Sequence, residues 1–147
     1  MDKPYWIALV FLAGALMPLQ AAFNARLGAA GASPIHASLV SFFVGTLALA
    51  GYVLVKNLTV SWPGLVAAPW YAWLGGVSGA FSLTAIVLTF PKLGPGLSFG
   101  LVIAGQLMGS LVLEHFNILV AQPHPLSFLR VLGMALVLGG VVLIRTF

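Results

Sequence analysis

The sequence predicts an all-α integral membrane protein with five transmembrane helices in a single domain over residues 1–147. Hydrophobic residues make up 61% of the chain and charged residues only 5%, whereas about a quarter of the residues in soluble domains are charged. Apolar segments follow one another between stretches that contain prolines, glycines and charges. A helix of about 20 residues covers the roughly 30 Å hydrocarbon layer of a bilayer, so each segment can cross it once.

The rest of the composition argues against several functions. The six basic residues give a net charge of +4, but they are scattered singly and form no patch for nucleic acid. The chain has no cysteine, two acidic residues and three histidines, so it offers no thiolate nucleophile, metal cluster or Ser/His/Asp set. We expect no enzymatic activity, no cofactor, no metal and no nucleic-acid partner. The lipid bilayer is the expected surrounding.

The first predicted helix covers residues 5–24. Its apolar region continues past Pro18, which is longer than the core of a secretory signal peptide, and no convincing cleavage site follows. Pro18 removes one helical hydrogen bond, so near Gly14 and Pro18 the helix is either kinked or partly broken. Broken helices line substrate sites in transporters. Gln20 and Asn24 are four residues apart and share one face just beyond this point.

The second predicted helix covers residues 34–55. Ser33 and Pro34 form a strong helix start, because serine caps a helix and proline suits its first position. Lys56 and Asn57 end the helix at the membrane surface. Its surface is small and weakly polar, which suits close packing against another helix. The residues responsible are Ser38, Ser41, Gly45 and Thr46.

The third predicted helix covers residues 70–90 and follows a long surface loop. Aromatic side chains around its start are more typical of anchors at the lipid headgroups than of a ligand-stacking cage. They are Trp62, Trp70, Tyr71 and Trp73. Gly75, Gly76 and Gly79 belong to overlapping pairs of small residues spaced four apart, so another backbone is expected against this helix. Pro91 is expected to end it.

The fourth predicted helix covers residues 97–116 and holds most of the unusual chemistry. Gly105 and Gly109 form a GxxxG pair, which is typical of close helix packing in membranes. A neighbouring stripe carries a polar residue at every fourth position, namely Gln106, Ser110 and Glu114. One face of the helix is therefore expected to pack closely, and the other to meet water or a polar partner.

Two residues of this helix have alternative roles. Gln106 lies near the middle of the membrane, so it either contacts a substrate or gate or makes a hydrogen bond to another helix. Glu114 and Asp2 are the only carboxylates of the chain. Because Glu114 lies near the predicted helix end, it is an interfacial carboxylate or a partner of Arg26 or Arg130, or, if buried, an acid that couples transport to protons.

The fifth predicted helix covers residues 128–144, with Ser127 as its cap. Five crossings place equal numbers of basic residues on the two sides of the membrane. Lys3, Lys56 and Arg130 lie on one side and Arg26, Lys92 and Arg145 on the other. Because the lysine and arginine bias sets orientation, a tie allows insertion both ways, although other signals can still fix one orientation. Two opposite copies would reproduce the inverted repeat of many transporters.

Several motifs resemble the YdcZ-like family of small bacterial inner-membrane proteins, a five-helix branch of the drug/metabolite transporter superfamily. They are PLQAAFNARLG (18–28), SFFVGT (41–46), WLGGVSGA (73–80), PKLGPGLSF (91–99), GQLMGSLVLEHF (105–116) and RVLGMALVLGGVVLI (130–144). The resemblance implies a multi-pass inner-membrane protein that is a half-size transporter and works as an antiparallel homodimer. Family members usually carry aspartate at the position of Glu114. The small multidrug exporters of the superfamily use a carboxylate in the first helix, which is absent here, so the resemblance does not imply their proton exchange.

The expected function is transport of a small, unidentified solute through an inverted dimer. The expected substrate-contacting or pore-lining residues are Gln20, Asn24, Gln106, Ser110 and Glu114. A passive channel for an ion or small solute, formed by the same dimer, is the first alternative. A membrane scaffold without transport is the second.

Overall fold

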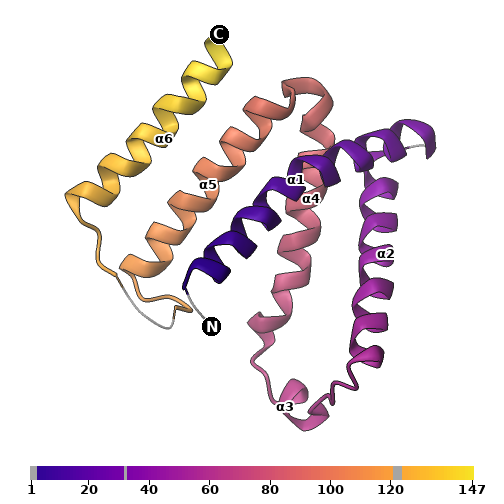
Figure 1. Ribbon diagram of the computed structural model, residues 1–147. Coiled ribbons are helices and arrows are strands. Elements are labelled where there is room, and N and C mark those ends of the chain that lie inside the picture. Colours follow the sequence, from indigo (N-terminus) through magenta and orange to yellow (C-terminus); the bar gives the residue numbers. More distant parts are fainter. Residues whose placement is uncertain (1–2, 32, 121–123) are drawn as a thin grey trace. The chain divides into compact units, whose positions relative to one another are not determined.

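The computed structural model describes residues 3–31, 33–120 and 124–147, and the described part contains helices but no strand (Figure 1). The elements are α1 (Lys3–Gly31), α2 (Pro34–Val55), α3 (Trp62–Val66), the 3₁₀ helix η1 (Trp70–Trp73), α4 (Leu74–Leu93), α5 (Pro95–His115) and α6 (Phe128–Thr146). Five helical segments are long and apolar enough to cross a membrane, with η1 and α4 counted as one. The all-α fold with five candidate membrane helices is therefore confirmed.

The chain divides into two compact units, Met1–Pro91 and Lys92–Phe147, called here the N-terminal and the C-terminal unit. In the N-terminal unit α1 packs against α2, and in the C-terminal unit α5 packs against α6. Few side chains are buried in either unit, whereas large apolar residues such as Val10 and Phe11 are 71% and 78% exposed. Such exposure suits helices whose outer faces are covered by lipid.

The contact between α1 and α2 depends on small residues. Ala21 and Asn24 of α1 and Ala37 and Ser38 of α2 are buried. A Cβ atom at Gly28 would lie 3.4 Å from both the backbone nitrogen and the Cα of Pro34, so a glycine lets the end of α1 lie against the start of α2. Small residues of this kind allow helix backbones to approach in membranes.

Helix α1 is longer than the sequence predicts. It continues to Gly31, although the first predicted helix ends at residue 24. Alanine is the strongest helix former, and the alanines that follow Arg26 continue the helix until the chain turns into α2. The helix also runs without interruption through Gly14 and Pro18. This course does not show the partly broken helix, which was one of the two interpretations of Pro18.

The predicted helix starts at Ser33 and Ser127 are confirmed. The Ser33 Oγ accepts a hydrogen bond of 3.3 Å from the backbone N–H of His36, and the Ser127 Oγ accepts one of 3.4 Å from the backbone N–H of Arg130. Each serine satisfies a backbone donor that the first turn of a helix leaves free.

The end of α4 also differs from the prediction. Helix α4 does not stop at Pro91 but continues to Leu93, because a proline near a helix end removes only one hydrogen bond. The chain turns instead at Gly94, whose φ of +76° favours glycine. Asn57 follows α2 with a φ of +49°, a conformation in which asparagine commonly ends helices. Within the long connection before α4, the structure has the short helix α3 instead of a continuous loop.

Two glycines of α5 other than the GxxxG pair bring α5 and α6 together. A Cβ at Gly100 would lie 3.0 Å from the Cγ2 of Val141, and one at Gly96 would lie 3.2 Å from the Cγ2 of Ile144. At Gly105 and Gly109 a Cβ would meet nothing within 4 Å among the described residues. Within the C-terminal unit, the GxxxG pair therefore lies outside the contact between α5 and α6.

Of the three glycines of α4 that were expected to face another backbone, only Gly79 has a described neighbour within 4 Å, and that neighbour is a side chain. A Cβ at Gly79 would lie 3.7 Å from the Cζ of Phe42 on α2, whereas at Gly75 and Gly76 it would meet no described atom within 4 Å. The tryptophans beside this region are exposed, with Trp70 at 76%, which suits side chains at the level of the headgroups.

Candidate functional site

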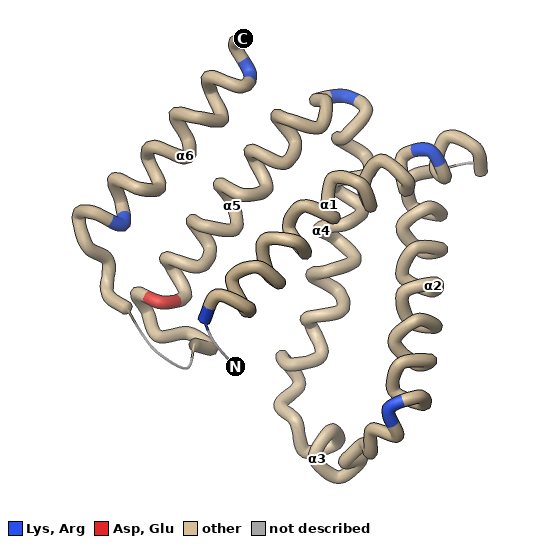
Figure 2. Tube along the Cα trace, in the orientation of Figure 1, with Lys and Arg blue, Asp and Glu red and all other residues tan. Residues whose placement is uncertain are grey.

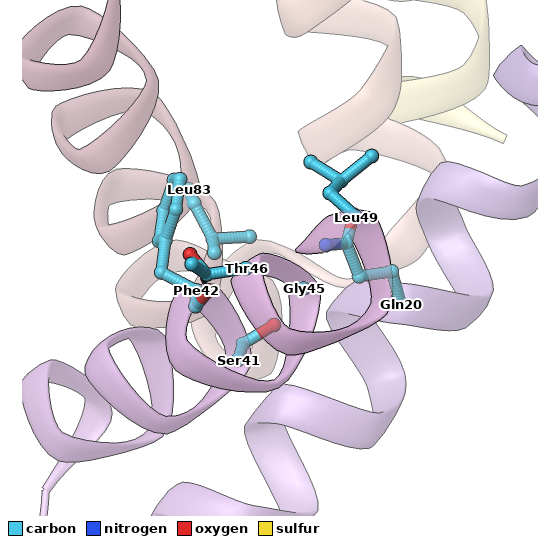
Figure 3. Close-up of a pocket in the computed structure, with 7 residues that line it drawn as sticks. All are labelled: Gln20, Ser41, Phe42, Gly45, Thr46, Leu49 and Leu83. Carbon is cyan, nitrogen blue, oxygen red and sulfur yellow. Dashed lines mark hydrogen bonds between the residues drawn. The ribbon is translucent and has the colours of Figure 1, made fainter. Parts of the chain in front are cut away.

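A cavity of about 240 Å³ lies among α1, α2 and α4 of the N-terminal unit (Figure 3). Its polar groups are the amide of Gln20 and the hydroxyls of Ser41 and Thr46. Its apolar walls come from α2 and α4, and the residues are Phe42, Gly45, Leu49 and Leu83. The cavity thus combines hydrogen-bonding groups with an apolar lining, and it lies between helices that can cross a membrane.

The α2 side of the cavity follows from residue spacing. Phe42, Gly45, Thr46 and Leu49 recur at intervals of three and four, so they share one face of the helix. Gly45 leaves space there because a Cβ would meet nothing within 4 Å. The hydroxyl of Thr46 donates a hydrogen bond of 2.8 Å to the carbonyl of Phe42. Its proton is thus bound within the helix, and its oxygen remains able to accept a bond from a solute.

Asn24 lies behind the cavity wall and contacts it through Ser41. The Nδ2 of Asn24 donates a hydrogen bond of 3.2 Å to the Oγ of Ser41, and Asn24 is only 5% exposed. Because Ser41 lines the cavity and Asn24 does not, the asparagine orients the serine hydroxyl and does not reach the cavity itself. Gln20 and Asn24, predicted on one face of α1, therefore belong to the same site.

The polar stripe of α5 lies on the C-terminal unit. Gln106 and Ser110 are exposed, and the Ser110 hydroxyl bonds to the carbonyl of Leu107 in its own helix at 3.0 Å. Within the described residues the side chain of Gln106 makes no hydrogen bond. Since hydrocarbon offers an amide no hydrogen-bond partner, this face requires water or another protein surface.

Glu114 pairs with Arg130, one of the two partners that the sequence suggests. The two side chains form an ion pair between α5 and the start of α6 and are 27% and 31% exposed, respectively. The Nη1 of Arg130 also donates a hydrogen bond of 2.8 Å to the carbonyl of His124. In Figure 2 the red segment of the tube lies at the end of α5, and Glu114 is the only acidic residue in the described part, which excludes Asp2. The ion pair connects the start of α6 to the end of α5. The bond to His124 connects Arg130 to the residues before α6.

Of the residues that line the cavity, only Gln20 was predicted from the sequence to belong to a site. Sequence reasoning predicted the face of Gln20 and Asn24, but it assigned Ser41 and Thr46 to helix packing and did not connect them with a site. The available signal was the spacing of a serine, a glycine and a threonine in the segment 41–46, which puts two hydroxyls beside a gap in the helix surface. Gln106, Ser110 and Glu114 lie on α5 of the other unit.

The comparisons with known proteins agree with the resemblance noted in the sequence. A family model described as "Putative inner membrane exporter, YdcZ" matches residues 5–143. This description is that of an exporter family and not of an enzyme family. No curated protein and no solved structure matches the chain. With its five apolar helices, the chain is a multi-pass inner-membrane protein, and since the match covers nearly its full length, it belongs to the YdcZ family of the drug/metabolite transporters.

Proposed function

We propose that the chain is one half of an exporter that works as an antiparallel homodimer and moves a small neutral solute. The cavity among α1, α2 and α4 carries this proposal. Gln20, Ser41 and Thr46 offer it amide and hydroxyl groups, and its other walls are apolar. No charged residue belongs to its lining, so an ionic solute would find no counter-charge there.

Two further observations support a second copy as the missing part. The cavity of about 240 Å³ is smaller than the roughly 300 to 1,000 Å³ of typical small-molecule sites. On α5, the amide of Gln106 makes no hydrogen bond among the described residues, and Gly105 and Gly109 lie outside the contact between α5 and α6. A second copy would offer Gln106 a hydrogen-bond partner. It could also pack closely against Gly105 and Gly109, since small residues favour close helix packing in membranes.

Efflux of two dyes tests the cavity. Cells that produce the chain are loaded with N-phenyl-1-naphthylamine, which is neutral, or with ethidium, which is a cation, and the loss of fluorescence is followed. We expect faster, saturable efflux of the neutral dye and a rate about three- to tenfold lower for Thr46→Val. Thr89→Val is the matched control, because Thr89 makes the same kind of hydrogen bond, 2.8 Å to the carbonyl of Ala85, but lies outside the cavity.

The same assay separates the alternatives. Equal rates for Thr46→Val and Thr89→Val would contradict the assignment of the cavity, and neutral-dye efflux no faster than in cells without the chain would contradict a neutral solute. A flux that rises in proportion to the gradient without saturating would identify a passive channel. A scaffold would show no flux with either dye, and its variants would change only stability.

A coupling role for Glu114 requires its ion pair with Arg130 to open during the transport cycle. The pair favours a structural role, since each side chain already has a counter-charge. Glu114→Gln removes the proton acceptor and keeps the size of the side chain. With a structural role, Glu114→Gln should leave the dependence of efflux on a pH gradient unchanged. Loss of that dependence, with exchange of dye across the membrane retained, would assign proton coupling to Glu114.

A further inference from the structure

A second hollow lies in the C-terminal unit, on one side of the contact between α5 and α6. It has a volume of about 400 Å³. Its lining includes two cations, Lys92 and Arg145, and otherwise only leucine and valine side chains: Leu93, Leu97, Leu101, Val141 and Val142. We call this hollow the basic groove. The solute cavity of the N-terminal unit shares none of these residues.

The basic groove changes from charged to apolar along the helices. Lys92 lies in the last turn of α4 and Arg145 in the last turn of α6, so both cations lie where helices end (Figure 2). Leu97 and Leu101 line the groove from α5, which begins at Pro95. At about 1.5 Å per residue, Leu101 lies roughly 9 Å further into the membrane than the start of α5.

We propose that the basic groove binds an anionic phospholipid, with its phosphate between Lys92 and Arg145 and an acyl chain along the leucines and valines. The two cations would bind the phosphate, and the apolar side chains below them would contact an acyl chain. A free anion would use only the two cations. Basic pockets between membrane helices are suited to anionic headgroups. The volume of about 400 Å³ lies in the range of roughly 300 to 1,000 Å³ that small-molecule sites occupy.

Native mass spectrometry of the purified chain tests this site. The protein in mixed micelles is titrated with phosphatidylglycerol, or with phosphatidylcholine as the neutral reference, and the lipids retained per chain are counted. Micelles have no sides, so a change of membrane orientation does not affect the result. We expect one phosphatidylglycerol to be retained in preference to phosphatidylcholine. Lys92→Gln with Arg145→Gln should weaken its binding about 30-fold, as expected for two basic residues.

Two control pairs make the result specific. Arg26→Gln with Lys56→Gln removes the same charge from residues outside the groove and should keep the preference. Leu101→Trp fills the groove without changing charge and should remove the bound lipid. Ile103→Trp should not, although Ile103 is on the same helix and is exposed like Leu101, at 48% and 49%. Far-UV circular dichroism confirms that each variant is helical.

Three outcomes would overturn the proposal. The first is equal retention of the two lipids by the unchanged chain. The second is an equal loss in both charge variants, which would mean non-specific attraction. The third is displacement of the bound lipid by glycerol 3-phosphate, which has the charged headgroup without the chains and would mark the groove as a site for a soluble anion.

Discussion

At the scale of single residues, the hydrogen bond between Asn24 and Ser41 is expected to stabilise the contact between α1 and α2. Its length is 3.2 Å, and such bonds in membrane proteins contribute about 0.6 kcal/mol on average. We expect a double-mutant cycle of Asn24→Ala and Ser41→Ala to give a coupling energy of about that size. The free energy of unfolding in mixed micelles is the measurement.

A second cycle supplies the control. Ser38 is also buried on α2, but its hydroxyl donates to the carbonyl of Pro34 in its own helix, at 3.0 Å. Asn24→Ala and Ser38→Ala should therefore give a coupling near zero. If the two cycles gave the same coupling, the energy would come from general packing at the α1 and α2 contact and not from the hydrogen bond.

Ser98 is expected to respond in the opposite way. Its side chain is buried at 4% exposure, and its Oγ has no hydrogen-bond partner among the described residues. A buried polar group without a partner is costly, so Ser98→Ala should leave the free energy of unfolding unchanged or raise it by about 1 kcal/mol. A loss of more than that amount, measured in the same micelles, would show that the hydroxyl has a partner in the assembled protein.

At the scale of helices, α5 offers two glycine pairs with different expected effects. A Cβ at Gly100 would lie 3.0 Å from the Cγ2 of Val141, so Gly100→Ala should destabilise the α5 and α6 contact by about 1 to 3 kcal/mol. Val141→Ala removes the atoms that clash and should restore much of this loss. Thermal unfolding of the purified chain is the measurement.

Gly105→Ala is the matched variant for Gly100→Ala. Space is open at Gly105, and alanine is a better helix former by about 1 kcal/mol, so the monomer should be as stable as before or more stable. Association of two copies, followed by cross-linking in membranes, should weaken if Gly105 packs against a second copy. Equal destabilisation by both substitutions in monomeric protein would contradict the difference between the two pairs.

The helices themselves could be predicted well, and their contacts only in part. Apolar length marked the five membrane segments, and Ser33 and Ser127 marked helix starts, because these signals are local. Which glycine pair of α5 contacts α6, Gly96 with Gly100 or Gly105 with Gly109, does not depend on a local signal. Both are small pairs spaced four apart, and only the position of Val141 and Ile144 on α6 decides which pair is in contact.

The candidate site shows the same limit. Gln20 and Asn24 were predictable because a helix repeats every 3.6 residues, which places them on one face. Their partners on α2 were not, since the rotation of α2 about its axis determines whether Ser41 faces α1 or lipid. Likewise, Glu114 had two possible partners in the sequence, and the fold of α6 against α5 selected Arg130.

At the scale of the whole molecule, the balance of basic residues predicts that the chain inserts in both orientations. The described lysines and arginines lie near helix ends (Figure 2), where they influence insertion. Since the chain has no cysteine, Phe147→Cys provides a single label site. A reagent that does not cross membranes should label about half of the copies in cells, as dual insertion requires. Labelling of all copies or of none would contradict dual insertion.

Changing this balance should separate orientation from function. Two lysines inserted after Lys56 give one side of the membrane an excess of two and should force a single orientation, so that a lone copy loses dye efflux. Lys3→Gln with Lys56→Gln shifts the balance the other way by the same amount. If opposite copies form the exporter, each variant should be inactive alone and efflux should return when the two are produced together.

Two glutamines inserted after Lys56 control for the insertion itself, because they add length without charge and should leave both orientation and efflux unchanged. Full efflux from the lysine variant alone would refute the antiparallel dimer, since every copy would then have the same orientation.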